Sequence, residues 1–216
     1  MTVREDMYEE LLKQQAAHRE EQRERVAAAR RAAERQQAID EMPRRHVAVI
    51  AAVDDHGGFS KNGEIPWYYP DDFKWFKQAT ANQLCLMGRL TYEDICKRRG
   101  DAAKDEVLPN RKSFVMSHSL TELNNATVVT GVLDVESHLG DDDLDKTLFV
   151  IGGERLFVEG ITRANTVYLT VINKDFSCDK FFPLTYLQER FTIDKMYKCQ
   201  TSPDLRFLIW KRKQGL

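Results

Sequence analysis

The stretch "TLFVIGG", residues 147–153, joins a short apolar run rich in β-branched and aromatic side chains to two glycines. A helical pattern follows at residues 154–160. A buried strand that turns at glycine into a helix is a repeating unit of α/β proteins. Bare glycine backbone at the start of a helix also lets an anion approach the positive helix end, although a lone Gly-Gly pair commonly makes only a tight turn.

The same alternation continues over the rest of residues 43–216. Further runs of strand length and β-branched content lie at residues 46–53, 83–88, 113–117, 126–130 and 166–172, and further helical patterns lie at residues 71–80 and 91–98. This order predicts an α/β domain with a mixed, mostly parallel sheet flanked by helices. Residues 190–199 and 205–213 are predicted to form an antiparallel hairpin at the sheet edge.

Residues 1–42 differ from the rest of the chain in composition. They contain no glycine or proline and consist mostly of Glu, Arg, Gln and Ala, which predicts a long charged N-terminal helix before the domain of residues 43–216. One short apolar stripe does not continue as a heptad seam; it consists of Met7, Tyr8, Leu11 and Leu12. Two interpretations stay open: a solvated charged helix, or a helix that docks a protein partner or self-associates.

The composition limits the classes of function. The 216 residues carry a formal net charge of −2 and are 42% hydrophobic, as expected of a soluble globular protein. No basic surplus indicates a nucleic-acid partner, no apolar run approaches the roughly 20 residues of a membrane helix, and the N-terminus lacks the apolar core of a signal peptide. Cys85, Cys96, Cys178 and Cys199 lie far apart, without metal-ligand spacing. We therefore expect reduced thiols, no metal site and a cytoplasmic protein.

The helical pattern at residues 71–80 follows Pro70 and begins with two adjacent carboxylates. Asp72 shares a helical face with three apolar residues, Trp75, Phe76 and Ala79. It is therefore expected to point inward, whereas Asp71 is expected in the exposed first turn. An inward carboxylate needs a partner. Two alternatives stay open: both aspartates cap the helix, or Asp72 binds a flat, nitrogen-rich heterocycle through paired hydrogen bonds.

The domain resembles the dihydrofolate reductase family through six motifs that occur in order and at matching spacing. They are "GFSKNGEIPW" (58–67), "PDDFKWF" (70–76), "MGRLTYE" (87–93), "LPNRK" (108–112), "VIGGERLF" (150–157) and "VYLTVI" (167–172). The resemblance covers residues 46–213. It implies reduction of 7,8-dihydrofolate to 5,6,7,8-tetrahydrofolate by hydride transfer from NADPH, in support of one-carbon metabolism.

The resemblance also implies a catalytic group of Asp72, Trp67 and Thr170. Asp72 matches the acid that binds the pterin ring and supports its protonation, Thr170 matches the hydroxyl that assists this acid, and Trp67 belongs to the lid over the nicotinamide. Arg111 matches the arginine that pairs with the α-carboxylate of the glutamate tail. The residues implied to bind substrate are Ile50, Ala52, Phe73, Phe76 and Arg111.

Two glycine turns carry the implied cofactor site, "GRLT" (88–91) and "GGER" (152–155). The family has a cis peptide in the second turn. Its implied cofactor-binding residues are Ala52, Ile65, Gly88, Arg89, Leu90, Thr91, Ser117, His118, Ile151, Gly152, Gly153, Glu154, Arg155, Leu156 and Phe157. Arg89, Arg155 and the 117–118 turn match positions near the adenosine phosphates, which favours NADPH over NADH.

The chain departs from the family pattern at several positions. Phe157 stands where a tyrosine is frequent, Ser60 and Asn110 replace glycines, and residues 97–107 are longer than the minimal connection. Two other functions stay open. One is a reductase of another pterin or a pyrimidine, against which Asp72 and Arg111 both argue; the other is a reductase-like interaction module with weak or no catalysis.

Overall fold

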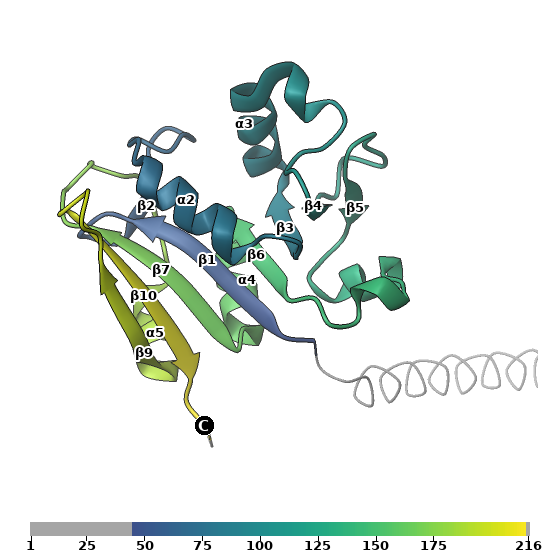
Figure 1. The fold of residues 1–216 in the computed structure, drawn as a ribbon. Coiled ribbons are helices and arrows are strands. Elements are labelled where there is room, and N and C mark those ends of the chain that lie inside the picture. The colour runs from purple at the N-terminus through teal and green to yellow at the C-terminus, as the bar shows by residue number, and fades with distance from the viewer. Residues whose placement is uncertain (1–44, 215–216) are drawn as a thin grey trace, which may run out of the picture. The chain divides into compact units, whose positions relative to one another are not determined.

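The computed structural model describes residues 45–214. They form an eight-stranded sheet with helices on both faces, together with a small two-stranded sheet (Figure 1). The strand order of the large sheet is β5-β4-β3-β6-β1-β7-β10-β9. The helix predicted at residues 1–42, and its boundary with the domain, lie outside the described residues.

Six neighbouring strands of the large sheet run parallel. They are β1 (Val47–Val53), β3 (Leu84–Gly88), β4 (Lys112–Met116), β5 (Thr127–Val129), β6 (Leu148–Gly152) and β7 (Thr166–Ile172). β10 (Leu205–Arg212) pairs antiparallel with β7 and with the edge strand β9 (Phe191–Lys198). The predicted mixed, mostly parallel sheet and its edge hairpin are therefore confirmed.

The helices cover the sheet from both sides, because alternate side chains of each strand point to opposite faces. They are α2 (Pro70–Ala79), α3 (Arg89–Arg99), α4 (Glu154–Arg163) and α5 (Leu184–Arg190). On one face, Val49 of β1 belongs to a core cluster that includes residues of α4 and α5. On the other face, Ala48 and Ile50 pack in a cluster with residues of α2 and α3. Figure 1 shows α2 in front of the sheet and α4 and α5 behind it.

Several short elements were not predicted. They are β2 (Gly58–Ser60), β8 (Lys180–Phe181), α5 and the 3₁₀ turns Gly100–Ala103, Leu133–His138 and Asp141–Asp143. β2 and β8 pair antiparallel and form the small sheet. Two or three residues carry no measurable periodicity, so only tertiary pairing can define such strands.

The parallel strands place their carboxyl ends at one edge of the sheet, where ligands of open α/β sheets commonly bind. Gly88, Met116 and Gly152 end three neighbouring strands there. The four cysteines are unpaired. Among the described residues, no helix is both long enough and apolar enough to cross a membrane.

Candidate active site

A cleft of about 910 Å³ opens at the carboxyl ends of β3, β4 and β6. Its lining contains every residue predicted to bind substrate or cofactor, and also Asp72 and Trp67. Thr170 does not line the cleft: it is only 1% exposed, and its hydroxyl approaches the Asp72 carboxylate closely enough to lower the pKa of that group. Tertiary folding therefore gathers residues that lie more than 100 positions apart in the sequence.

Asp72 lies in the first turn of α2 and lines the cleft. Burial raises the pKa of its carboxyl group above the usual value, and the hydrogen bond from the Thr170 hydroxyl opposes that rise. A carboxylate has about four lone-pair positions, so this one neutral partner leaves most of its accepting capacity for a ligand. The arrangement suits a group that both binds a polar ring edge and favours its protonation.

Asp71 has a different environment. Its Oδ2 accepts hydrogen bonds from the hydroxyls of Thr201 and Ser202, both at 2.7 Å. These bonds tie α2 to the β9–β10 connection, and together with Cys199 they hold the pKa of Asp71 below its usual range. Asp71 lies in the first turn, as predicted, but it is half-buried rather than exposed, because a distant turn of the chain packs against it. Neither aspartate caps the helix: its N-cap is Tyr69, without a side-chain cap bond.

Apolar side chains surround Asp72 on the walls of the cleft. Ile50 and Ala52 come from β1, and Phe73 and Phe76 come from α2. The two aromatic residues follow the carboxylate on the helix at spacings of one and four positions, so the local turn of α2 brings ring faces and a charge to one place. Such a surface can hold a flat aromatic ligand whose polar edge reaches the carboxylate.

Arg111 lines the cleft beside the C-terminal end of α2. Its Nε donates to Thr80 Oγ1 at 2.8 Å, and its two terminal nitrogens donate to the carbonyls of Pro109 and Lys77 at 2.5 and 2.9 Å. Asn110, immediately before it, has a φ of 59°, a left-handed conformation that Asn tolerates well. Because guanidinium has five N–H groups, these three bonds fix its orientation and leave two for a carboxylate.

The two glycine turns lie next to each other in the lining of the cleft. Gly88 and Gly153 are the N-caps of α3 and α4, and neither helix has a side-chain cap bond. The peptide between Gly152 and Gly153 is cis, and Gly152 has a φ of 138°. A Cβ atom at Gly152 would lie 3.2 Å from Thr91 Oγ1. Both helices therefore begin with uncapped N–H groups, and the glycines there have no Cβ atoms to block an approaching ligand. This arrangement suits a phosphate group.

The cationic residues near these turns are not equivalent. Arg89 donates to Glu93 one helical turn later at 2.5 Å, whereas Arg155 and His118 are exposed and line the cleft without an ion pair among the described residues. The Ser117 hydroxyl accepts from the backbone N–H groups of Ser119 and Leu120. Ser117 therefore stabilises the turn that presents His118, and Arg155, exposed and without an ion pair among residues 45–214, is available to an anionic ligand.

Comparisons with known proteins agree with this geometry. A family model described as dihydrofolate reductase matches residues 46–212. The chain belongs to the dihydrofolate reductase family. Among its relatives, the dihydrofolate reductase of Bacillus subtilis is 31% identical over 174 residues, covering 78% of this chain and 96% of the relative. That of Buchnera aphidicola subsp. Acyrthosiphon pisum is 33% identical over 138 residues, covering 64% and 79%.

The fold is also shared with a solved member of the family. The structure titled dihydrofolate reductase from Enterococcus faecalis, complexed with NADP(H) and RAB-propyl, superposes with a TM-score of 0.64. It is 24% identical in sequence, and the match covers 78% of this chain and 97% of that one. This likeness shows the fold of the family.

Ile65 and Trp67, which the sequence resemblance assigns to a lid, lie in the loop of residues 61–69, which we call the lid segment. Trp67 within it is 7% exposed and packs against Phe176 with ring centroids 5.0 Å apart. Ile65 is 40% exposed and lines the cleft. Ser60, where dihydrofolate reductases commonly have glycine, lies in β2 outside the left-handed region, so serine brings no backbone strain there.

Phe157, where a tyrosine is frequent in dihydrofolate reductases, lies in an aromatic cluster. Its ring contacts Phe59 and Phe182 edge-on, with centroids 5.1 and 5.2 Å away. Phe157 is 3% exposed and is surrounded by apolar rings. A phenylalanine at this position therefore leaves no polar group unpaired.

Sequence reasoning missed several charged residues of the cleft. Its lining also includes Glu64, Lys77, Asp94, Arg98, Arg99 and Lys180. Helical periodicity could have found some of them, because Asp94 and Arg98 follow Thr91 on the same face of α3 at spacings of three and seven. Arg98 pairs with Asp94 at 2.8 Å.

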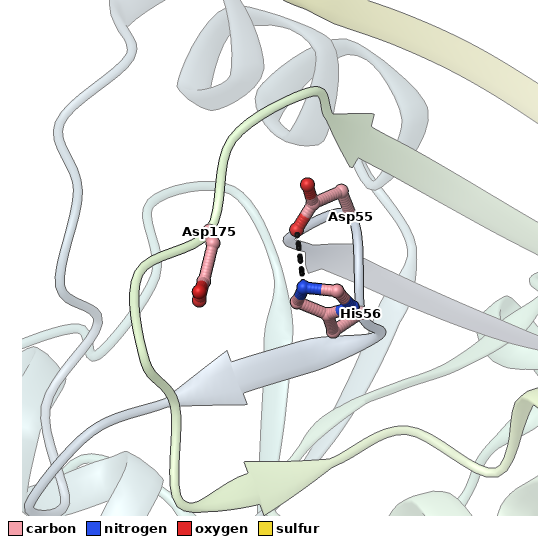
Figure 2. A group of neighbouring side chains, drawn as sticks. All are labelled: Asp55, His56 and Asp175. Carbon is pink, nitrogen blue, oxygen red and sulfur yellow. Dashed lines mark ion pairs between the residues drawn. The ribbon is translucent and has the colours of Figure 1, made fainter.

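A cluster outside the dihydrofolate reductase cleft combines two carboxylates and an imidazole. Figure 2 shows Asp55 and His56, from the β1–β2 turn, beside Asp175 from the β7–β8 connection. His56 Nε2 lies 3.7 Å from Asp55 Oδ1, and all three residues are exposed. Solvated acidic groups commonly meet in this way, and we assign no metal site to the cluster.

Proposed function

We propose that this chain reduces 7,8-dihydrofolate to 5,6,7,8-tetrahydrofolate by hydride transfer from NADPH. Membership of the dihydrofolate reductase family supports this activity. The observation that carries the proposal is Asp72, a partly buried carboxylate with a single neutral partner on the apolar wall of the cleft. The same cleft extends to two glycine turns that suit a phosphate-bearing cofactor.

Asp72 has two roles in the proposed reaction. Its oxygens accept hydrogen bonds from the ring amide and the 2-amino group of the pterin, a planar pair of donors that matches a carboxylate. Its negative charge in a poorly solvated site also favours a proton on the ring nitrogen beside the carbon that receives hydride. Thr170 keeps the carboxylate oriented by donating its hydroxyl hydrogen.

The remainder of the substrate is held by shape and by Arg111. Phe73 and Phe76 offer aromatic faces to the pterin and benzoyl rings, and Ile50 and Ala52 form the strand side of the slot. The two N–H groups that Arg111 does not use within the fold form a charge-assisted pair with the α-carboxylate of the tail. A fixed guanidinium loses little entropy when it binds.

The residues at the glycine turns fit NADPH. The uncapped N–H groups of α3 and α4 bind the pyrophosphate, and the absence of a Cβ at Gly152, which would meet Thr91, gives it room. Arg155 and His118 bind the additional ribose phosphate, with Arg89 available if it leaves Glu93. NADPH supplies the hydride when bound. Ile65 and Trp67 exclude water from the place of transfer.

Two further proposals concern the whole chain. We expect the reaction to take place in the cytoplasm, where four free thiols remain reduced. Residues 1–42 are proposed to serve a partner or self-association rather than catalysis, since every motif that carries the family resemblance lies after Pro43.

The test is NADPH oxidation followed by absorbance, with purified protein and dihydrofolate. Turnover that depends on both compounds supports the proposal. A folded protein that binds neither compound would favour the interaction module, and turnover only with another pterin or a pyrimidine would favour a different substrate.

A further inference from the structure

The lid segment begins with a tight four-residue turn. Lys61 and Glu64 exchange two backbone hydrogen bonds, of 2.9 and 3.0 Å, around Asn62 and Gly63. Both central residues have positive φ, 51° and 84°, as a type I′ turn requires. The backbone of the turn is therefore well defined, and the direction in which Glu64 leaves it is set locally.

One side of this turn is anchored to the small sheet. The Asn62 N–H donates to Asp179 Oδ2 at 2.7 Å, and Asp179 N–H donates to the carbonyl of Ser60. These bonds attach the start of the lid segment to the strand pair β2–β8. They do not reach α3, which contributes several residues to the lining of the cleft.

Glu64 makes the contact with α3. Its Oε1 accepts a hydrogen bond from Lys97 Nζ at 3.0 Å, and Lys97 lies in the last turn of α3. Among the hydrogen bonds and ion pairs within residues 45–214, this pair alone joins the lid segment to α3. Glu64 lines the cleft, as do several residues of α3, so the pair connects two segments that contribute to its lining.

The charges around Lys97 explain why it pairs with Glu64 rather than with a residue of its own segment. Three acidic residues lie within four positions on its own segment, but each has another cation. The pairs are Glu93 with Arg89 at 2.5 Å, Asp94 with Arg98 at 2.8 Å, and Asp101 with Lys104 at 2.7 Å. Lys97 therefore has no local carboxylate left, and the lid segment supplies one.

We propose that the Glu64–Lys97 ion pair holds the lid segment against α3 and makes both residues positioning residues for hydride transfer. The proposal rests on the proposed function for its link to the reaction. Glu64 directly precedes Ile65 and lies three residues before Trp67, so the pair keeps these side chains at the cleft and slows the release of bound ligand. The side chains of Lys97 and Glu64 are 75% and 62% exposed, so the stabilisation that the ion pair gives the lid segment is modest and sensitive to salt.

The experiment uses the full chain and five variants. Lys97→Gln and Glu64→Gln each remove one charge, a double variant removes both, and Glu64→Lys with Lys97→Glu reverses the pair. Lys104→Gln is the matched control, because it removes an equally exposed lysine from a local pair away from the cleft. Amide hydrogen exchange of residues 63–69 is measured without ligand, and NADPH dissociation is measured by stopped-flow fluorescence.

Each single variant is expected to speed lid exchange and NADPH release about two- to five-fold at low salt. The double variant should be no faster than either single variant, and the reversed pair should return both rates most of the way to those of the unmodified chain. Molar salt should abolish the difference between the single variants and the unmodified chain. Single variants that behave like Lys104→Gln, or effects that add in the double variant, would overturn the proposal. Because exchange is measured without ligand, it tests the pair even if turnover is absent, and absent turnover in the unmodified chain would refute only the proposed function.

Discussion

Asp72→Asn replaces the cleft carboxylate with an amide of nearly the same shape. An amide cannot favour a proton on the pterin ring and offers only one acceptor oxygen, so we expect kcat/KM to fall about 10²- to 10⁴-fold at neutral pH. This loss corresponds to about 3–5 kcal/mol of transition-state stabilisation. Because Thr170 is the one side chain among the described residues that stabilises the ionised carboxylate, the amide leaves little of the protein unpaired.

The fold should tolerate this substitution. Burial raises the pKa of Asp72, so above the ordinary carboxyl pKa the native state binds its proton more readily than the unfolded chain does. The contribution of Asp72 to stability therefore falls as pH rises from the ordinary value through the raised one, and the ionised group is unfavourable at neutral pH. The variant should melt at the same temperature as the unmodified chain or higher.

Asp71→Asn is the matched control, one residue away. The pKa of Asp71 is lowered by the hydroxyls of Thr201 and Ser202, so its stabilising contribution is present at neutral pH and is lost as pH falls through the lowered pKa. This variant should lower the melting temperature at neutral pH and leave kcat/KM nearly unchanged.

NADPH oxidation with dihydrofolate, recorded between about pH 5 and 9, and thermal melts over the same range check both variants. The loss in Asp72→Asn should shrink as pH falls, because solvent then protonates more of the substrate. Equal losses of turnover in the two variants, no loss in either, or a loss in Asp72→Asn that follows its melting temperature would refute the reasoning.

Arg111→Leu is expected to weaken dihydrofolate binding by about 2–5 kcal/mol and to spare a tail-less pterin, as measured by fluorescence titration; matching losses for both ligands would contradict its tail assignment. Arg155→Gln should lower the preference for NADPH over NADH about tenfold, mainly through KM, since Arg155 has no ion pair within the described fold. An unchanged ratio of the two efficiencies would count against that role. A chain beginning at Pro43 should keep its cofactor preference and most of its turnover; a truncation that is folded by circular dichroism but inactive would place residues 1–42 in the catalytic unit.

Much of the sheet could be predicted because its strands are nearly continuous apolar runs. The prediction at residues 166–172 coincides with β7, and the other parallel strands differ from their predicted ranges by no more than one residue at either end. Burial on both faces of a parallel sheet imposes this composition, so the signal is local and strong.

The candidate site was predictable where the decisive property is local. Asp72 points to the cleft because the helical period places it with Phe76, and the glycine turns follow from residue type. The neighbour of Asp71 could not be predicted, because Thr201 lies 130 residues away and nothing in a helical period specifies a distant hydroxyl.

The sequence by itself determined the α/β class, the buried parallel strands, the inward Asp72 and the glycine-led helices, because each depends on periodicity or on a residue's own backbone freedom. Tertiary structure alone decided the strand order and the short β2–β8 pair. It also decided the bonds that orient Arg111 and the ion pair between Glu64 and Lys97. The β2–β8 pair, the bonds from Arg111 to α2 and Thr80, and the Glu64–Lys97 pair each join residues more than 30 positions apart. The free energy that selects them comes from packing the whole core rather than from any local pattern.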